Sequence, residues 1–123
     1  MKTIFATVAS FVLFSAFVYV ASPAEVEKRI LDSGVCVVEF NAGFNASNSV
    51  DWIDALSDCN GKRIDIATHP EMQKEYKIVV VPTIIIFNDE EEVKRFQANI
   101  MMQLEASKED VQEAVDEIIM SAF

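Results

Sequence analysis

The sequence predicts an α/β domain in which a central mixed β-sheet of four strands is flanked by helices. Three runs rich in β-branched residues, at 35–40, 63–67 and 79–87, are separated by segments that carry helix-start signals. A turn signal at residues 88–90 then connects the third run directly to a fourth strand. We therefore expect parallel crossovers among the first three strands and an antiparallel edge strand added by the hairpin.

The first 24 residues differ in composition from the rest of the chain. Lys2 precedes an uncharged and largely apolar stretch, residues 3–22, which is typical of a signal peptide. Because this stretch approaches the ~20 residues that span a bilayer, and Pro23 interrupts the cleavage site, an uncleaved membrane anchor is an alternative. A third interpretation makes residues 17–20 a fifth strand of the sheet. The first two interpretations place the remaining domain, residues 25–123, outside the cytosol, as a periplasmic or secreted protein.

Each expected helix begins at a recognisable start signal. Ser22 and Glu25 form a capping box around Pro23 for the first helix, which ends at Gly34. The second helix is expected to begin at residues 47–49 and to carry Val50, Ile53 and Leu56 on one face. Pro70 opens the third helix, PEMQKEYKI, and Ser107 caps the last. The apolar stripe of that last helix comprises Val111, Ala114, Val115, Ile118 and Ile119.

The strands follow from β-branched runs and from alternation of apolar and polar residues. VCVVEF, RIDIA and VVVPTIIIF supply the first three strands, the third of which contains Pro82. In VKRFQANIMMQL, apolar side chains alternate with mostly polar neighbours from Phe96 to Leu104, which predicts a long fourth strand. Ile100, Met101 and Met102 in this run are expected either to pack in the strand or to form an apolar edge for a partner.

Acidic residues dominate the domain that follows the apolar segment. The chain carries 20 Asp and Glu residues against 10 Lys and Arg residues, and every acidic residue lies after position 24. Such a surface repels nucleic acid and anionic membranes. We therefore expect no nucleic-acid partner, and membrane contact only through residues 3–22 if they are retained. His69, the single histidine, has no clustered ligands around it in the sequence, and no metal site is expected.

The order of elements and several strings resemble the thioredoxin family from about Glu25 to Met120. VVEFNAGFNASNS stands where thioredoxins have the pattern V-D-F-W-A-x-W-C-G-P-C-K. IDIATHPEMQKEYKIVVVPTIIIF is similar to V-D-x-D-x-N-P-x-L-A-x-x-Y-x-I-x-x-x-P-T-L-x-x-F, of which Y-x-I-x-x-x-P-T is the most specific part. The resemblance implies a thioredoxin-like fold, and it aligns the reactive loop of that family with residues 45–48.

The aligned loop lacks the residues that the chemistry of the family requires. Asn45 and Asn48 stand at the two cysteine positions, with Ala46 and Ser47 between them. Disulfide exchange needs an attacking thiolate and a second, resolving thiol, and an asparagine amide supplies neither. The sequence therefore predicts no catalytic residue and no cofactor here, which favours a non-catalytic binding or structural module. Asn45-Ala46-Ser47 also fits a glycosylation sequon.

The resemblance also implies a peptide-binding groove beside this loop. In the family the proline corresponding to Pro82 follows a cis peptide bond, and the residue before it offers backbone groups to an extended peptide. The expected groove is bordered by Phe44, Asn45, Val81, Pro82 and Thr83. An extended peptide or a protein is the expected partner. The alternative is that the proline is kept for packing alone.

The remaining reactive groups allow a redox alternative. Cys36 and Cys59 are the two cysteines, and a thioredoxin-type redox protein or redox sensor would have to use them. A structural disulfide between them requires Cα atoms within ~7 Å; otherwise they are separate buried or half-buried thiols. Glu39 corresponds to the buried acid that, in the resembled family, helps deprotonate the resolving cysteine. Its other interpretation is a strand glutamate paired with Lys62 or another base.

Overall fold

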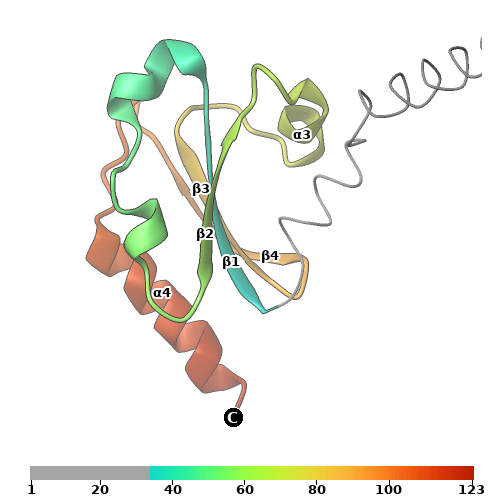
Figure 1. Cartoon of the computed structure of the whole chain (residues 1–123), viewed down its shortest axis with the longest axis vertical. Helices are drawn as coiled ribbons and strands as arrows, with labels where there is room; N and C mark the ends of the chain where they lie inside the picture. The colour runs from blue at the N-terminus through green and yellow to red at the C-terminus, as the bar shows by residue number, and fades with distance from the viewer. Residues whose placement is uncertain (1–33) are drawn as a thin grey trace, which may run out of the picture.

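The computed structural model describes residues 34–123 of the chain (Figure 1). The expected export segment or anchor (1–24), the alternative fifth strand (17–20) and the first helix, from residue 22, lie outside the described residues. Within the described part, no helix is long and apolar enough to cross a membrane.

A mixed sheet of four strands forms the centre of the domain. The strands are β1 (Val35–Asn41), β2 (Asn60–Asp65), β3 (Thr83–Asn88) and β4 (Glu91–Gln97), and their order across the sheet is β2-β1-β3-β4. β1 pairs with β2 in parallel, whereas β3 and β4 form an antiparallel hairpin. The predicted mixed sheet flanked by helices is thus confirmed.

The orientation of β3 differs from the prediction, because β3 runs antiparallel to β1 rather than parallel to it. The connection from β2 contains only one short helix, α3 (Pro70–Glu75), whose six residues span ~9 Å. A parallel crossover needs a helix that carries the chain back along the full strand length. Because α3 is too short for that, the chain stays near the end where β2 finishes, and β3 starts there (Figure 1).

Helical segments cover the two faces of the sheet (Figure 1). On one face, α3 contributes Met72 to a buried cluster with Val38, Phe40 and Ile85. On the other face, α4 (Lys108–Ser121) packs against the sheet through Val111, Ala114 and Val115, with Val37, Ile84 and Ile86 beneath them. Burying one such aliphatic side chain contributes ~1.5–3 kcal/mol, so these two clusters hold the elements together. Ser107 caps α4 with a reciprocal hydrogen bond to Asp110, as the sequence predicts for this start.

The predicted second α-helix is wrong, because two short 3-10 helices take its place. These are η1 (Gly43–Asn48) and η2 (Ile53–Ala55). Between them, the backbone of Val50 is held by side chains: its N–H donates to Glu39 Oε2 over 3.0 Å, and its oxygen accepts from Arg63. With both backbone groups of Val50 engaged in this way, a regular helix does not form through this segment.

The predicted long fourth strand is also wrong, because β4 ends at Gln97. Its partner β3 begins at Thr83, which pairs with Gln97, and Pro82 before it has no N–H to continue the ladder. The chain then forms a loop, residues 98–106, which we call the insertion loop. Asn99 organises its turn by accepting hydrogen bonds from the backbone N–H groups of Met101 (2.9 Å) and Gln103 (3.2 Å).

Candidate functional site

The loop that the resemblance aligns with a reactive site is built on buried asparagine. Asn45 lies in η1, directly after the end of β1, and only 3% of it is exposed. Its Oδ1 accepts a hydrogen bond of 2.8 Å from Asn48 Nδ2, so the two side chains at the cysteine positions contact each other. Asn41, at the end of β1, donates from Nδ2 to the backbone oxygen of Asn45 (3.1 Å) and to Ser49 Oγ (2.8 Å).

The Asn45 amide connects three segments that lie far apart in the sequence. Its Nδ2 is within hydrogen-bond distance of Asn41 Oδ1 (3.2 Å), of the Val81 oxygen (3.3 Å) and of the Met102 oxygen (3.2 Å). The two N–H bonds of the amide are therefore shared among β1, the segment before β3 and the insertion loop. We call this arrangement the Asn45 clamp. A buried amide with all its groups engaged fixes the geometry of its surroundings.

The Asn45 clamp engages the side chain that the predicted glycosylation sequon, Asn45-Ala46-Ser47, would use. The side-chain nitrogen that would carry a glycan is the Nδ2 that holds Val81 and Met102, and it lies inside the fold. The folded domain therefore does not present Asn45 as a glycan acceptor.

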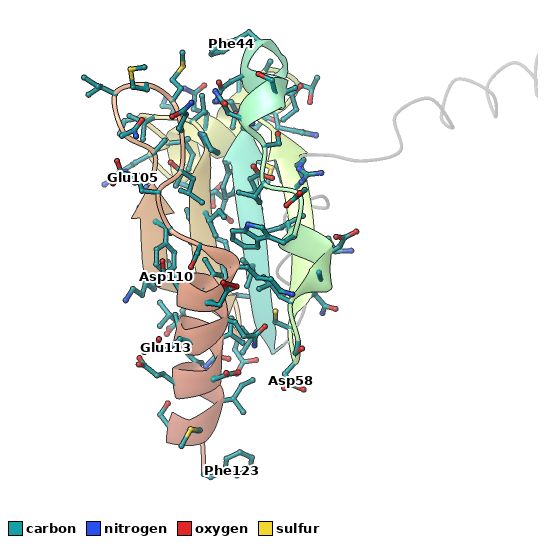
Figure 2. The ribbon with its side chains drawn as sticks, turned by 90° about the vertical axis from the view of Figure 1, so that its left-hand side faces the viewer. Phe44, Asp58, Glu105, Asp110, Glu113 and Phe123 are labelled. Carbon is teal, nitrogen blue, oxygen red and sulfur yellow. The ribbon has the colours of Figure 1, made fainter. Side chains whose placement is uncertain are left out.

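The structure places the expected groove residues in two groups. The Val81–Pro82 peptide bond is cis. Asn45, Pro82 and Thr83 are buried beneath the surface, whereas Phe44 and Val81 line a pocket. Phe44 projects at one tip of the molecule (Figure 2) and is 77% exposed. Of the five residues expected to border the groove, only Phe44 and Val81 therefore line the pocket.

The pocket has a volume of about 400 Å³ and a mainly apolar lining. One wall comes from the end of β1 and η1, through Ala42 and Phe44. A second comes from residues 66–81, and the third from the insertion loop, through Ile100 and Met102. The sequence offers these residues as an apolar edge for a partner, but the continued strand that it predicts does not place them beside η1. The volume suits one bulky side chain or a small ligand.

A row of valine backbone groups adjoins the pocket. Val79, Val80 and Val81 all line it, and Val79 is 76% exposed. Within residues 34–123, the backbone N–H groups of these three valines donate no hydrogen bond. Val80 is half-buried and Val81 is buried. Backbone N–H groups are obligatory hydrogen-bonding groups, so the N–H groups of Val79 and Val80 offer pairing positions for a strand-like ligand.

Glu39 is fully buried and forms an ion pair. Its Oε1 accepts from Arg63 Nε over 2.7 Å, and its Oε2 accepts from the Val50 N–H. Of the two interpretations offered by the sequence, the structure shows a paired strand glutamate. Arg63, rather than Lys62, is the base because it is the residue directly opposite Glu39 in the β1–β2 register. Aligning the two predicted strands in parallel could have identified this pair.

The two cysteines lie on different sides of the sheet. Cys36 is buried in the cluster that contains Phe40 and Met72, whereas Cys59 packs against the cluster that contains Val111. No disulfide joins them. Burial, followed by the neighbouring groups Cys36, Asp58 and Asp116, raises the pKa of the Cys59 thiol from 9.0 to about 11. Reactive cysteines have lowered pKa values, and Cys59 has the opposite.

No metal-binding arrangement is found among the described residues, where no group of three or more His, Cys, Asp or Glu side chains gathers closely enough. His69 lies at the start of α3, with its Nδ1 3.9 Å from a carboxylate oxygen of Glu71.

The chain is similar to solved thioredoxin structures. A mutant thioredoxin from Halobacterium salinarum NRC-1 shares 17% identity, with a TM-score of 0.63 over 76% of this chain and 82% of that chain. Thioredoxin from Fasciola hepatica shares 20% identity, with a TM-score of 0.56 over 76% of this chain and 91% of that chain. Oxidised thioredoxin from Plasmodium falciparum shares 14% identity, with a TM-score of 0.57 over 79% of this chain and 92% of that chain.

Models of protein families give no match to this chain, and neither do curated proteins. The likeness is therefore one of overall structure, at 14–20% sequence identity. On these grounds the chain has the thioredoxin fold.

Proposed function

We propose that this chain is an exported domain of thioredoxin fold that lacks thiol–disulfide oxidoreductase activity and binds an extended peptide segment of a partner protein. The observation that supports peptide binding is the apolar pocket beside Val79–Val81, because the same three residues supply unpaired backbone N–H groups. An extended peptide would place one side chain in the pocket and pair its backbone with this row.

Two features support the non-catalytic part of the proposal. Asn45 and Asn48 occupy the loop that would hold the reactive dithiol, and their side chains are engaged with each other. The thiols elsewhere are poor substitutes, because Cys36 is buried and the pKa of Cys59 is raised to about 11. At pH 7 a thiol with such a pKa is a thiolate in only about one molecule in 10⁴.

Export is proposed from the apolar N-terminal segment. A signal peptide gives a periplasmic or secreted protein, and an uncleaved segment gives a domain anchored by residues 3–22. N-terminal sequencing of the protein recovered from an exporting host separates the two outcomes. A mature chain that begins near Glu25 supports cleavage, an intact chain in the membrane fraction supports the anchor, and an intact chain that stays in the cytosol contradicts export.

Peptide binding is tested by titration with the uncharged pentapeptide Ser-Val-Leu-Val-Ser, capped at both ends. We expect binding that protects the amides of Val79–Val81 from hydrogen exchange. Val79→Ser removes one apolar lining residue, and we expect it to weaken binding several-fold.

Met120→Ser is the matched control for this titration. Met120 is 73% exposed, close to the 76% of Val79, but it lies near the end of α4 and does not line the pocket. The control should bind like the unmodified protein. Failure of the pentapeptide to bind, or equal loss in both variants, would contradict the proposed groove.

A further inference from the structure

Within residues 34–123, two carboxylates that form no ion pair lie next to residues that line the pocket, although neither of them lines it directly. Asp65 lies beside the first and second walls: its Oδ1 accepts from the Ala67 N–H over 2.8 Å, and a Cβ placed on Gly43 would be 3.7 Å from its Oδ2. Glu105 lies beside the third wall, where its Oε2 accepts from Asn99 Nδ2 over 3.0 Å. Among the described residues, neither carboxylate forms an ion pair.

The charge of the surrounding segments has the same sign. Residues 42–61 contain three aspartates and no lysine or arginine, and the insertion loop has Glu105 as its single charged residue. The α3 segment, residues 70–77, is balanced, because it carries two lysines and two glutamates. Arg63 lines the neighbouring hollow together with Asp65, but its charge is paired with the buried Glu39. Asp65 and Glu105 therefore keep their charges without an ion-pair partner in the described part of the chain, which favours a negative field at this edge of the pocket.

Building on the proposed peptide-binding function, we propose that the pocket selects basic segments of a partner protein. The segment carries one bulky aliphatic side chain, which enters the pocket, and lysine or arginine close to it, which faces Asp65 and Glu105. The net charge of −10 disfavours a second copy of this chain as the occupant. An acidic segment is disfavoured for the same reason.

The experiment compares three capped pentapeptides with one apolar core: Lys-Val-Leu-Val-Lys, Ser-Val-Leu-Val-Ser and Glu-Val-Leu-Val-Glu. Because partly exposed ion pairs are weak, we expect the basic peptide to bind about 3- to 10-fold more tightly than the neutral one at low salt. The acidic peptide should bind more weakly than the neutral one. The preference should shrink in 0.5 M NaCl, since the Debye length at that ionic strength is well below its ~10 Å at 0.1 M and the charges are screened more strongly.

A charge variant locates the preference. Asp65→Asn combined with Glu105→Gln keeps hydrogen-bond acceptors at both positions and should remove most of the preference, while binding of the neutral peptide is retained. Asp58→Asn is the control, because Asp58 lies at the end of the molecule away from Phe44 (Figure 2). This variant should keep the preference.

The outcomes separate the two proposals. If all three peptides bind equally, the charge selection is overturned while the peptide-binding function stands. If none of them binds, the peptide-binding function fails, and the selection fails with it. If the preference persists in the Asp65/Glu105 variant, the selection does not arise at this pocket, and the inference is overturned.

Discussion

The side-chain amide of Asn45 donates a hydrogen bond to the backbone oxygen of Val81, over 3.3 Å. Asn45 lies in η1, which aligns with the reactive loop of the resembled family, and Val81 directly precedes cis-Pro82. In that family these two parts meet the substrate. Here an internal hydrogen bond joins them, and the same amide also holds the Met102 oxygen of the insertion loop. The loop therefore keeps its place in the fold and acts as a support for the pocket walls.

Replacing Asn45 by alanine should lower the free energy of unfolding by ~1–3 kcal/mol, because the buried oxygens of Asn41 and Val81 lose their donor. Amide hydrogen exchange in the insertion loop should also become faster, since the hydrogen bond to Met102 is lost. Urea denaturation and exchange measurements check the two effects. Asn48→Ala is the control and should cost less, because it removes one part-buried hydrogen bond. Equal losses in both variants would count against the clamp.

Removing Arg63 should destabilise the fold through Glu39. The carboxylate of Glu39 is fully buried, so Arg63→Ala leaves a buried charge without its partner. We expect a loss of ~2–4 kcal/mol, toward the lower end because the Arg63 side chain is 45% exposed. The double variant Glu39→Gln/Arg63→Ala should recover part of that loss in denaturant unfolding.

The exposed pair Glu92–Arg95 is the comparison for this experiment. Glu92→Gln should cost less than about 1 kcal/mol, because ion pairs at the surface contribute little. If Arg63→Ala cost no more than Glu92→Gln, the buried ion pair would have no special role in stability.

Alkylation of Cys59 should be slow at neutral pH and should accelerate only in strong base. Because the pKa of its thiol is raised to about 11, the rate of reaction with iodoacetamide should keep rising up to that pH. The folded state binds the thiol proton more tightly than the unfolded state does. This contribution to stability is therefore fully present below pH 9 and is lost as the pH rises to about 11. A rate that levels off below pH 8 would instead support the redox alternative.

Gly61 should tolerate no side chain. A Cβ at this position would lie 1.8 Å from the backbone oxygen of Ile53, so η2 would have to move away from β2. We expect Gly61→Ala to cost ~1–3 kcal/mol or more in the free energy of unfolding. Gly43→Ala is the control, because its Cβ would meet only Asp65 Oδ2 at 3.7 Å, an ordinary contact. A similar stability for the two variants would show that η2 is not packed tightly on β2.

Local patterns were enough to predict a mixed sheet of four strands and the start of α4, but not the direction of β3 or the length of β4. The capping signal at Ser107 depends on four adjacent residues, and the β-branched runs at β1 and β3 are buried as their composition predicts. The prediction of a second α-helix failed because side chains distant in the sequence form hydrogen bonds with its backbone groups. Val50 is held by side chains from two strands, and no local pattern reveals this.

The prediction of a long fourth strand through the insertion loop failed for a related reason. Alternating apolar residues from Phe96 onward fit a strand, but a strand needs a partner, and β3 ends the ladder at Thr83. The third wall of the pocket is formed by that loop, so the sequence pattern could not predict it. The role of Asn45 was also hidden, since its acceptors on Val81 and Met102 are brought close only by the fold.

Introducing cysteines at both asparagine positions tests whether η1 has the backbone geometry for a disulfide. The backbone of η1 is kinked at Asn45, and the side chains of Asn45 and Asn48 meet there over 2.8 Å. The variant Asn45→Cys/Asn48→Cys should therefore form an internal disulfide on mild oxidation, detected as a loss of ~2 Da and of two titratable thiols.

The control pair Asn45→Cys/Ser47→Cys should form that bridge less readily, because residues two apart do not face each other in a helical turn. Bridging confined to the 45/48 pair would mean that the backbone of η1 has the geometry of a dithiol site. In that case the side chains alone account for the absence of a dithiol. Two thiols that stay reduced in the 45/48 variant would instead show that the Asn45 clamp and the insertion loop have reshaped the backbone itself.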